Sequence, residues 1–346
     1  MTYSFAAKTF LLSRTDSIGD VVLTLPMCGW LKQHIPGARI IFLGKTYTKA
    51  IIECCPDVDA FLNWDELRVL PRTDQAALLR QHHIEVAIHV FPHKDIARLC
   101  WQAGIPHRIG TRNRWFHWLF CNHLVALSRR HSPLHESQLN LELLRPVGLS
   151  QMPDKIALAA YLHFGPPAPL PAALQAWLKP GRPHVLLHPK SQGSAREWDL
   201  EKFGLLARLL HQRGYQVFVS GTMQEQALIQ DWLAKNQAFI TDLTGKLTLP
   251  QFLSFIGACD GLVAASTGPL HLAAALGIHA LGLFPPMKPI HPGRWAPIGA
   301  QAEFLVLNKD CQDCRTDPAA CHCIRQISVK AALERIVGWQ LGAPEV

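Results

Sequence analysis

Charged residues are scarce in this sequence: Asp, Glu, Lys and Arg make up 17% of it, whereas apolar residues make up 49%. This composition excludes a disordered chain. Short repeats and low-complexity tracts are absent, and no basic segment followed by a long apolar run opens the sequence. The length of 346 residues predicts two globular domains. The missing signal peptide favours a reducing cytoplasm for the ten cysteines.

Three fingerprints of common enzyme sites are also missing. Neither half of the chain contains G-x-G-x-x-G, so a nicotinamide dehydrogenase is poorly supported. The glycine-containing loop His188–Trp198 lacks the Gly-Lys-Ser/Thr ending of a Walker A loop. No G-x-S-x-G elbow is present, which argues against a hydrolase of the related α/β type.

Charge is absent altogether from Gly261 to Met287, a run long enough to raise the question of a membrane span. Polar residues and the pairs Gly268-Pro269 and Pro285-Pro286 interrupt the run. The pattern therefore predicts a strand, a helix and a second strand, at Gly261–Ala264, Pro269–Leu276 and His279–Phe284.

The turn Ser266–Pro269 between that strand and helix is a candidate phosphate site. Ser266 or Thr267 can cap the helix, and Pro269 fits its first turn. A helix that opens directly off a strand presents free backbone N–H groups and a positive dipole end to an anion. Gly268 permits close approach, and His271 lies one turn further on. The alternative is a tight turn with a buried core histidine.

The remaining chain alternates strands and helices in two similar halves, separated by the proline-rich segment Phe164–Pro171. The first half predicts strands at Thr9–Leu12, Arg39–Leu43, Ala60–Leu62 and Val86–Val90, and helices at Val21–His34, Tyr47–Cys54, Asp74–Gln81, Lys94–Ala103 and Leu134–Val147. The second half predicts further strands at His184–His188, Gln216–Ser220, Ala238–Ile240 and Glu303–Leu307, and helices at Asp199–Arg213, Met223–Ala234 and Leu249–Ile256. This alternation indicates parallel sheets, which bind ligands beyond the carboxyl ends of their strands.

Polar residues follow the first strand of each half. Asp16 and Asp20 follow the first strand of the chain, where a carboxylate can act as a general base, although the local pattern alone favours a helix cap as the role of Asp20. Lys190 and Arg196 follow the first strand of the second half, where they can hold a phosphate group. These loops are the candidates for chemistry.

The net charge of +8 favours an anionic partner. Between Arg98 and His131 there are six arginines, no Asp or Glu, and several interleaved tryptophans and phenylalanines. Exposed aromatic patches usually mark binding. Arg112 and Arg114 are therefore candidates for contact with an anionic acceptor or a membrane face, and basic loops over core aromatics are the alternative.

The tail contains Cys311-x-x-Cys314 and Cys321-His322-Cys323. Four thiols and a histidine can bind zinc, but the single residue between Cys321 and Cys323 is not a common zinc spacing. Clustered free thiols are the other interpretation, and we assign no metal site.

Several blocks of the sequence form a recognisable series. They are Arg14–Pro26, His188-Pro189 with Arg196-Glu197-Trp198, Ser220-Gly221 with Glu225, Asp242–Gly245, Ser266–Gly277 and the cysteine tail. Together they resemble the bacterial ADP-heptose:lipopolysaccharide heptosyltransferases, glycosyltransferase family 9, and they run in the family's order from near residue 9 to near residue 337.

The resemblance implies a GT-B fold, with two Rossmann-like domains facing each other across a cleft. Residues 1–165 would bind the acceptor, 166–182 would form a proline-rich linker, and 183–327 would bind the nucleotide sugar. Residues 328–346 would form a helix that crosses back to the first domain. The implied reaction is an inverting, metal-independent sugar transfer that needs no cofactor.

The resemblance also assigns roles to residues. Asp20 would be the catalytic base. The donor would contact Arg196, Glu225 through its ribose, Thr267 and Gly268 through its diphosphate, and His271 behind them. From their places in the same loops, Lys190 and Ser266 are further candidates for donor binding. The expected acceptor is a phosphorylated lipid-linked saccharide. Its candidate contacts are Arg14, in the first block of the resemblance, and Arg112 and Arg114 of the arginine- and aromatic-rich stretch. The enzyme is expected in the cytoplasm, in peripheral contact with the inner membrane face.

Two departures leave alternatives open. Some heptosyltransferases carry Asp where this chain has Ser266, and a small residue is frequent at the position of Lys190. The expected donor is ADP-heptose and the expected acceptor is the inner core of lipopolysaccharide. A different nucleotide sugar or a different acceptor is the alternative. Nucleic acid is not expected as a partner, because no compact recognition motif is present.

Overall fold

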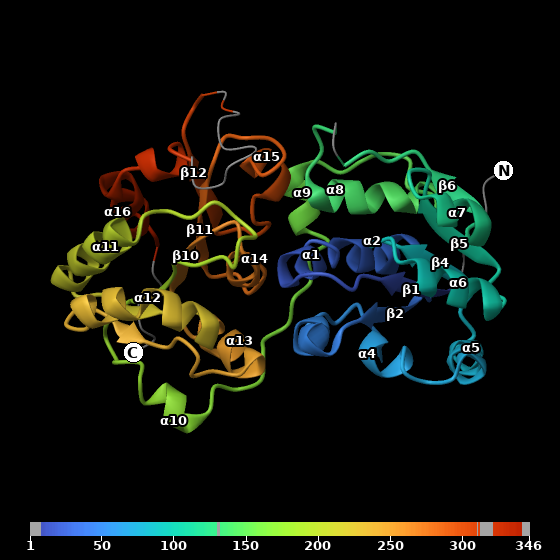
Figure 1. The fold of residues 1–346 in the computed structure, drawn as a ribbon, viewed down its shortest axis with the longest axis horizontal. Coiled ribbons are helices and arrows are strands. Elements are labelled where there is room, and N and C mark those ends of the chain that lie inside the picture. Colours follow the sequence, from blue (N-terminus) through green and yellow to red (C-terminus); the bar gives the residue numbers. More distant parts are fainter. Residues whose placement is uncertain (1–7, 130–131, 310, 312–320, 341–346) are drawn as a thin grey trace. The chain divides into compact units, whose positions relative to one another are not determined.

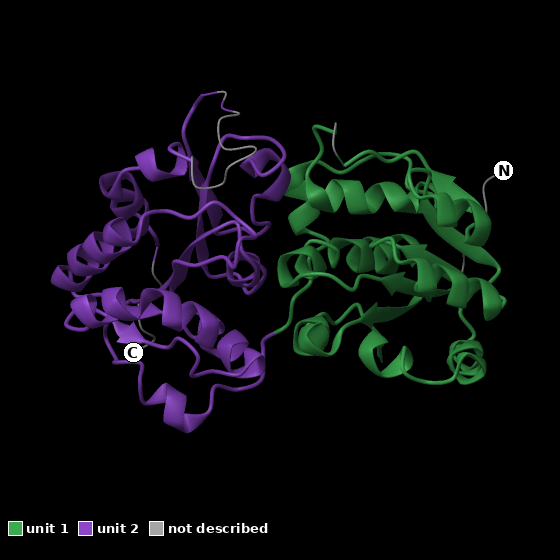
Figure 2. Cartoon of the chain, in the orientation of Figure 1, with its two compact units in different colours: residues 1–165 green, residues 166–346 purple. Residues whose placement is uncertain are grey.

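The structure, a computed structural model, describes residues 8–129, 132–309, 311 and 321–340. The chain divides into two compact units, unit 1 from Met1 to Gly165 and unit 2 from Pro166 to Val346 (Figure 2). Each unit is built on one parallel β-sheet flanked by helices (Figure 1). The expected α/β class is thereby confirmed.

Unit 1 follows the alternation expected from the sequence. Its elements are β1 (Thr9–Ser13), α1 (Ile18–Val22), α2 (Pro26–His34), β2 (Arg39–Gly44), η1 (Thr46–Thr48), α3 (Lys49–Ile52), β3 (Ala60–Asn63), α4 (Trp64–Leu67), α5 (Arg72–Gln81), β4 (Val86–His89), α6 (Lys94–Gln102), β5 (His107–Thr111), α7 (Trp115–Phe120), β6 (His123–Val125), α8 (Glu136–Leu141), η2 (Glu142–Val147) and α9 (Lys155–Ala159). The strand order is β3-β2-β1-β4-β5-β6.

Unit 2 repeats this plan. Its elements are α10 (Ala172–Gln175), β7 (His184–His188), α11 (Leu200–Gln212), β8 (Gln216–Val219), α12 (Met223–Asn236), β9 (Thr241–Asp242), α13 (Leu249–Gly257), β10 (Gly261–Ala265), α14 (Gly268–Ala275), β11 (His279–Phe284), α15 (Pro292–Trp295), β12 (Ala302–Val306), η4 (Ile324–Gln326) and α16 (Val329–Val337). The strand order is β12-β11-β10-β7-β8-β9.

Both sheets have the Rossmann order, in which the connections reverse direction beside the first strand of the unit. The reversal falls between β1 and β4 in unit 1 and between β7 and β10 in unit 2. Ligands of such sheets bind beyond the carboxyl ends of the strands at this switch point. The loops that follow β1, β7 and β10 are the ones the sequence marks as candidates.

The sheets carry continuous apolar runs because helices cover them. In unit 1, Leu11, Ile41 and Ala87 on neighbouring strands contact Ile96 and Leu99 of α6 in one buried cluster. In unit 2, α16 packs against α11 and β11, with Ala332 and Ile336 fully buried. This packing ties α16 to unit 2, and the expected crossing of residues 328–346 to the first domain stays a prediction.

Three local expectations were wrong or incomplete. The helix expected over Val21–His34 is two helices, because Pro26 has no N–H to continue α1. The strand expected at Ala238–Ile240 is instead β9, from Thr241. The arginine- and aromatic-rich segment between Arg98 and His131 contains β5, α7 and β6, which were not expected because its arginines and aromatics follow no helical or strand period. Among the described residues, no helix is both long and apolar enough to span a membrane.

Candidate functional site

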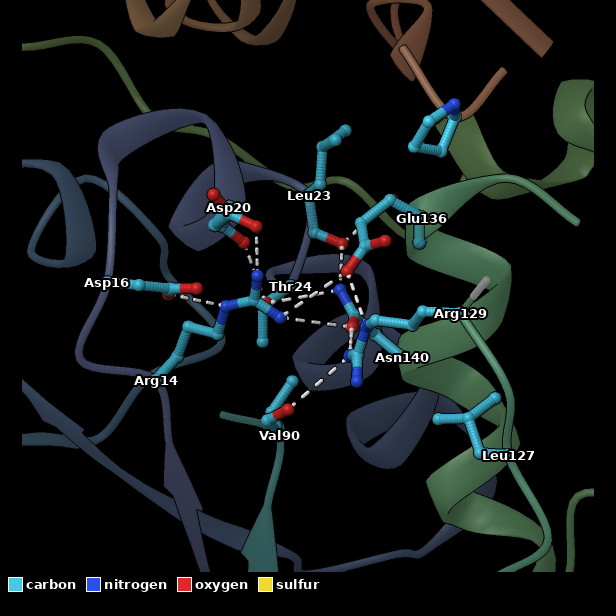
Figure 3. A network of polar contacts seen from close by, with 12 residues as sticks. Arg14, Asp16, Asp20, Leu23, Thr24, Val90, Leu127, Arg129, Glu136 and Asn140 are labelled. Atoms are coloured by element: carbon cyan, nitrogen blue, oxygen red, sulfur yellow. Dashed lines mark hydrogen bonds and ion pairs between the residues drawn. The ribbon is translucent and has the colours of Figure 1, made fainter. Parts of the chain in front are cut away.

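A buried arginine organises the carboxyl edge of the unit 1 sheet (Figure 3). Arg14 directly follows β1, and its side chain is only 3% exposed. Its Nε donates to Oδ1 of Asp16 at 2.6 Å, and its Nη2 donates to Oδ1 of Asp20. On the other side, Nη1 donates to Oδ1 of Asn140 at 3.2 Å and lies 3.6 Å from Oε1 of Glu136.

A second arginine extends this cluster from the opposite side. Arg129 donates from Nε to Oε1 of Glu136 at 2.9 Å and from Nη2 to Oδ1 of Asn140 at 2.9 Å. Glu136 is 1% exposed, so its charge is compensated by two guanidinium groups rather than by water. We call Arg14, Asp16, Asp20, Arg129, Glu136 and Asn140 the carboxylate cluster.

The break at Pro26 is what ties this cluster to α8. Because α1 ends, the Leu23 carbonyl is available to side chains of α8: it accepts from Oγ of Ser137 at 2.7 Å and from Nδ2 of Asn140 at 3.1 Å. Asn140 therefore joins the loop after β1 to α8 through both ends of its amide. The arrangement fixes the loop after β1 and the short helix α1, which carries Asp20.

Asp20 and Asp16 share one guanidinium but differ in environment. Asp20 lies in the first turn of α1, where Oγ of Ser17 also donates to its carboxylate and Oγ1 of Thr24 donates to its backbone oxygen at 2.8 Å. Burial raises the pKa of Asp16 to about 6, with Arg14 opposing this shift and the charge of Asp20 adding to it. Since a general base works best with a pKa near the working pH, Asp16 is a competitor for that role.

The structure changes the interpretation of Arg14. Its guanidinium is buried among three carboxylates and an amide, so its visible role is to hold Asp16 and Asp20. Direct contact with an acceptor stays a prediction. Sequence reasoning missed Glu136, Arg129 and Asn140. The one available signal was the spacing of Glu136 and Asn140, which places two polar groups on one face of an expected helix.

Arg112 and Arg114 lie at the same edge of the sheet, beyond β5, and both are exposed. They precede α7, whose Trp115, Trp118 and Leu119 are each 62% exposed. Lys94 at the start of α6 sits 4.9 Å from the centre of the Trp115 ring. Cations therefore surround an exposed aromatic surface, which we call the α7 surface.

In unit 2, the strand-to-helix turn expected at Ser266–Pro269 is present. β10 ends at Ala265, and α14 begins at Gly268 with Thr267 in the N-cap position. The Thr267 side chain makes no capping bond, contrary to expectation: its Oγ1 donates to the Ala265 carbonyl at 3.3 Å. The first-turn N–H groups of α14 thus have no side-chain cap and can meet an anion. His271 is buried one turn further on.

The loop after β7 is closed by an ion pair. Nζ of Lys190 contacts Oε2 of Glu197, whose Oε1 accepts from the Ser191 N–H at 2.9 Å and from Ser191 Oγ at 2.8 Å. Lys190 is therefore partly neutralised by its own loop. Arg196 is half-buried in the same loop.

The loop after β8 places Glu225, which is 3% exposed, in the first turn of α12. Its Oε2 accepts from the Thr222 N–H at 2.7 Å, and its own N–H donates to Oγ1 of Thr222, so the pair forms a capping box. Glu225 thus has a structural role, and the expected ribose contact stays a prediction. His188 and Ser220 join the ends of β7 and β8 at 2.9 Å.

The seven residues expected to bind the donor follow three adjacent strands, β10, β7 and β8, and so lie at one edge of the unit 2 sheet. Among the described residues, no group of three or more His, Cys, Asp or Glu side chains is placed to hold a metal ion. Cys311, Cys321 and Cys323 are buried, and Cys314 lies outside the described residues. Burial raises the pKa of the Cys323 thiol to about 11, and a hydrogen bond with Cys311 adds to the shift.

Comparison with known proteins agrees with this geometry. Residues 76–324 match the model of glycosyltransferase family 9 (heptosyltransferase). Lipopolysaccharide heptosyltransferase 2 of Escherichia coli strain K12 is 25% identical over 285 residues, covering 79% of this chain and 81% of that protein.

Two solved structures share the fold. The E. coli ADP-heptose lipopolysaccharide heptosyltransferase II superposes with a TM-score of 0.72 at 21% identity, over 95% of this chain and 97% of that one. An E. coli heptosyltransferase with ADP-2-deoxy-2-fluoro heptose has a TM-score of 0.66 at 17% identity, over 95% and 99%. These matches confirm the expected GT-B fold.

Proposed function

The chain belongs to glycosyltransferase family 9, and from this membership we infer that it transfers a heptose from ADP-heptose to the inner core of lipopolysaccharide. The observation that carries the donor assignment is the N-terminus of α14, which opens off β10 at the switch point beside the Lys190–Arg196 loop. The similar fold that holds an ADP-heptose analogue supports the same class of donor.

The proposed reaction is a single displacement with inversion. The acceptor hydroxyl attacks the anomeric carbon as the bond to the diphosphate breaks, and Asp20 takes the hydroxyl proton. ADP leaves with the bonding electron pair. The first-turn N–H groups of α14 and the Arg196 guanidinium stabilise its growing negative charge, so this route needs no metal. Asp20 is suited to its role because Arg14 and Ser17 fix its carboxylate.

The acceptor and its membrane are assigned to unit 1. Arg112 and Arg114 can bind phosphate groups of a lipid-linked saccharide, since guanidinium forks match phosphate geometry. The exposed tryptophans of the α7 surface suit the lipid–water interface. We therefore assign the enzyme to the cytoplasmic face of the inner membrane, in peripheral contact.

A second donor is favoured by one observation. Ser266 stands at the start of the phosphate turn, where some heptosyltransferases carry Asp, and it can neither repel nor bind the donor as a carboxylate would. A different nucleotide sugar, or an acceptor other than lipopolysaccharide, is the alternative function.

A thermal-shift panel of ADP, UDP, GDP and their sugars separates these functions. A ligand at about 100 times its Kd adds roughly 2.7 kcal/mol to stability. We expect ADP and ADP-heptose to give the largest shifts. Arg196→Ala should weaken ADP binding by roughly tenfold or more, because a charge-assisted hydrogen bond contributes about 1.5–3 kcal/mol. Arg213→Ala, an exposed arginine of the same unit, is the matched control. Unchanged ADP affinity in Arg196→Ala would refute this donor site.

A further inference from the structure

Unit 1 contains a cavity that none of the roles above uses. It has a volume of about 460 Å³, and its lining residues come from α4, α5, α6 and the segments next to them. Small-molecule sites commonly measure about 300–1,000 Å³, so the cavity can hold a sugar-sized group. Trp64 and Leu99, both from the buried cluster of unit 1, contribute its apolar wall.

The lining of the cavity is strongly cationic. Three arginines, Arg68, Arg72 and Arg98, face it together with a single carboxylate, Asp95. Nε of Arg68 lies 3.8 Å from Asp65, but that carboxylate also accepts from the Thr46 N–H at 3.0 Å. Within the described part of the chain, the guanidinium groups of Arg72 and Arg98 have no hydrogen-bond or ion-pair partner.

The position of Arg72 is not explained by helix stability. Arg72 is the first residue of α5, and the N-terminus of a helix disfavours positive charge. An unpaired cation at this end is a cost to the free protein. A bound anion would offset that cost, because both the guanidinium and the helix dipole attract negative charge.

Neutral hydrogen-bonding groups complete the lining. Gln75 donates from Nε2 to the Leu70 carbonyl at 2.8 Å, which holds its amide in place and leaves its oxygen to accept from a ligand. Nδ1 of His93 is buried without a hydrogen bond and lies 4.0 Å from Asp95, too far to bond to it. Burial lowers the pKa of His93; the charge of Asp95 opposes this shift, and the charges of Lys45 and Arg68 add to it.

We propose that this cavity binds a phosphate group carried on a sugar, with Arg72 and Arg98 as its phosphate ligands and Gln75 and His93 meeting the hydroxyl groups. A lone phosphate ion would fill only a small part of the cavity and would leave the side-chain amides in its lining without a ligand partner. The proposal rests on the proposed function only for the identity of the natural ligand. A phosphorylated saccharide acceptor is the molecule that would carry such a phosphate group. The site then selects acceptors by a phosphate away from the reacting hydroxyl.

The test uses the full chain and glucose 6-phosphate as the probe, with binding measured by calorimetry at low ionic strength. We expect glucose 6-phosphate to bind and glucose not to bind. Arg72→Ser/Arg98→Ser should raise the Kd for glucose 6-phosphate at least about tenfold, since each charge-assisted hydrogen bond contributes about 1.5–3 kcal/mol before screening. The melting temperature of this double variant should equal that of wild type, because neither guanidinium bonds to the described part of the protein. Arg39→Ser/Arg213→Ser, which removes two exposed arginines outside the cavity, is the control.

Two further arms separate the sources and the hypotheses. Vesicles of phosphatidylcholine with phosphatidylglycerol should bind wild type and Arg72→Ser/Arg98→Ser equally; a variant that loses vesicles but keeps glucose 6-phosphate would overturn the proposal in favour of a lipid headgroup. Equal Kd values for glucose 6-phosphate in wild type and variant would also overturn it. Arg196→Ala should keep glucose 6-phosphate binding while losing ADP binding. The two measurements therefore test the cavity and the donor site independently, and a wrong donor assignment would not change the conclusion about the cavity.

Discussion

The same edge of the same type of sheet is built in opposite ways in the two units. In unit 1 the edge is a closed network, where Arg14 and Arg129 bond to three carboxylates and an amide from three segments of the chain (Figure 3). In unit 2 it is an uncapped helix end, with a lysine and an arginine in the neighbouring loop.

The proposed roles of the two edges account for the difference. A carboxylate that accepts a proton has to be held in one place, and the side chains of Arg14 and Ser17 hold Asp20. A diphosphate brings its own charge and four or more acceptor oxygens, so the protein needs only donors that are already oriented. Unit 1 therefore satisfies its polar groups internally, whereas unit 2 leaves donors for the ligand.

The largest expected effect is on turnover. Asp20→Asn keeps the shape of the side chain but removes the proton acceptor, and loss of a general base typically costs about 10²–10⁴-fold in rate. We expect kcat to fall by that factor while ADP affinity holds, because ADP is assigned to unit 2. Steady-state kinetics with a lipopolysaccharide acceptor and ADP calorimetry measure the two quantities.

The matched variant is Asp16→Asn, which alters the other carboxylate on the same guanidinium. If Asp16→Asn loses turnover while Asp20→Asn keeps it, Asp16 is the base. Retained turnover in both variants would place the base outside the carboxylate cluster and break the division between the units.

The next effect is on folding. Arg14→Met removes the cation shared by Asp16, Asp20 and Glu136 and leaves their charges poorly compensated. Breaking a buried pair by removing one partner costs about 3–5 kcal/mol, which denaturant unfolding would measure. Lys49→Met, which breaks an exposed pair with Glu53, should cost about 1 kcal/mol or less. Equal costs would show that the cluster is no more than a surface ion-pair network.

The contrast between the units also explains how much the sequence could predict. The turn at Ser266–Pro269 could be predicted because all its parts are local: a strand, two polar residues, a glycine and a proline in succession. Both parallel sheets followed from the alternation of strands and helices. Their Rossmann-like type followed from the resemblance to glycosyltransferase family 9, which was confirmed.

The carboxylate cluster could not be predicted as a whole, because its members are far apart in sequence. Arg14 meets Asn140 across 126 positions, and neither residue carries a local signal for the other. The capping box of Glu225 with Thr222 is entirely local, but the resemblance drew attention to the donor, and that donor contact stays a prediction. The cavity among α4, α5 and α6 depends on how these helices pack, and the spacing of apolar residues along the sequence does not predict that packing.

A smaller effect concerns pH. The pKa of Asp16 is about 6 in the folded chain, above its ordinary value of 3.8, so the folded state binds this proton more tightly than the unfolded state does. The free energy of unfolding should therefore fall as pH rises from about 4 to about 6. Relative to wild type, Asp16→Asn should lose that dependence, a change on the order of 2 kcal/mol across the window. A stability difference that is constant with pH would show that the burial of Asp16 does not affect its titration.

The smallest effect should appear at the α7 surface, where every contact is exposed and screened. Arg112→Ser/Arg114→Ser removes two cations whose side chains bond to none of the residues that the structure describes, so the melting temperature should hold. Near an anionic membrane each basic residue contributes about 1 kcal/mol, so loss of two should weaken binding to vesicles containing phosphatidylglycerol about thirtyfold. The KM for a lipid-linked acceptor should rise in parallel, while ADP affinity and kcat stay constant.

Arg182→Ser/Arg213→Ser, which removes two exposed arginines of unit 2, has the same change in net charge and should leave vesicle binding unchanged. If both double variants lose vesicle binding equally, net charge alone attracts the membrane. If neither double variant loses vesicle binding, the exposed tryptophans or another part of the chain bind the membrane, and the assignment of the acceptor to unit 1 loses this support.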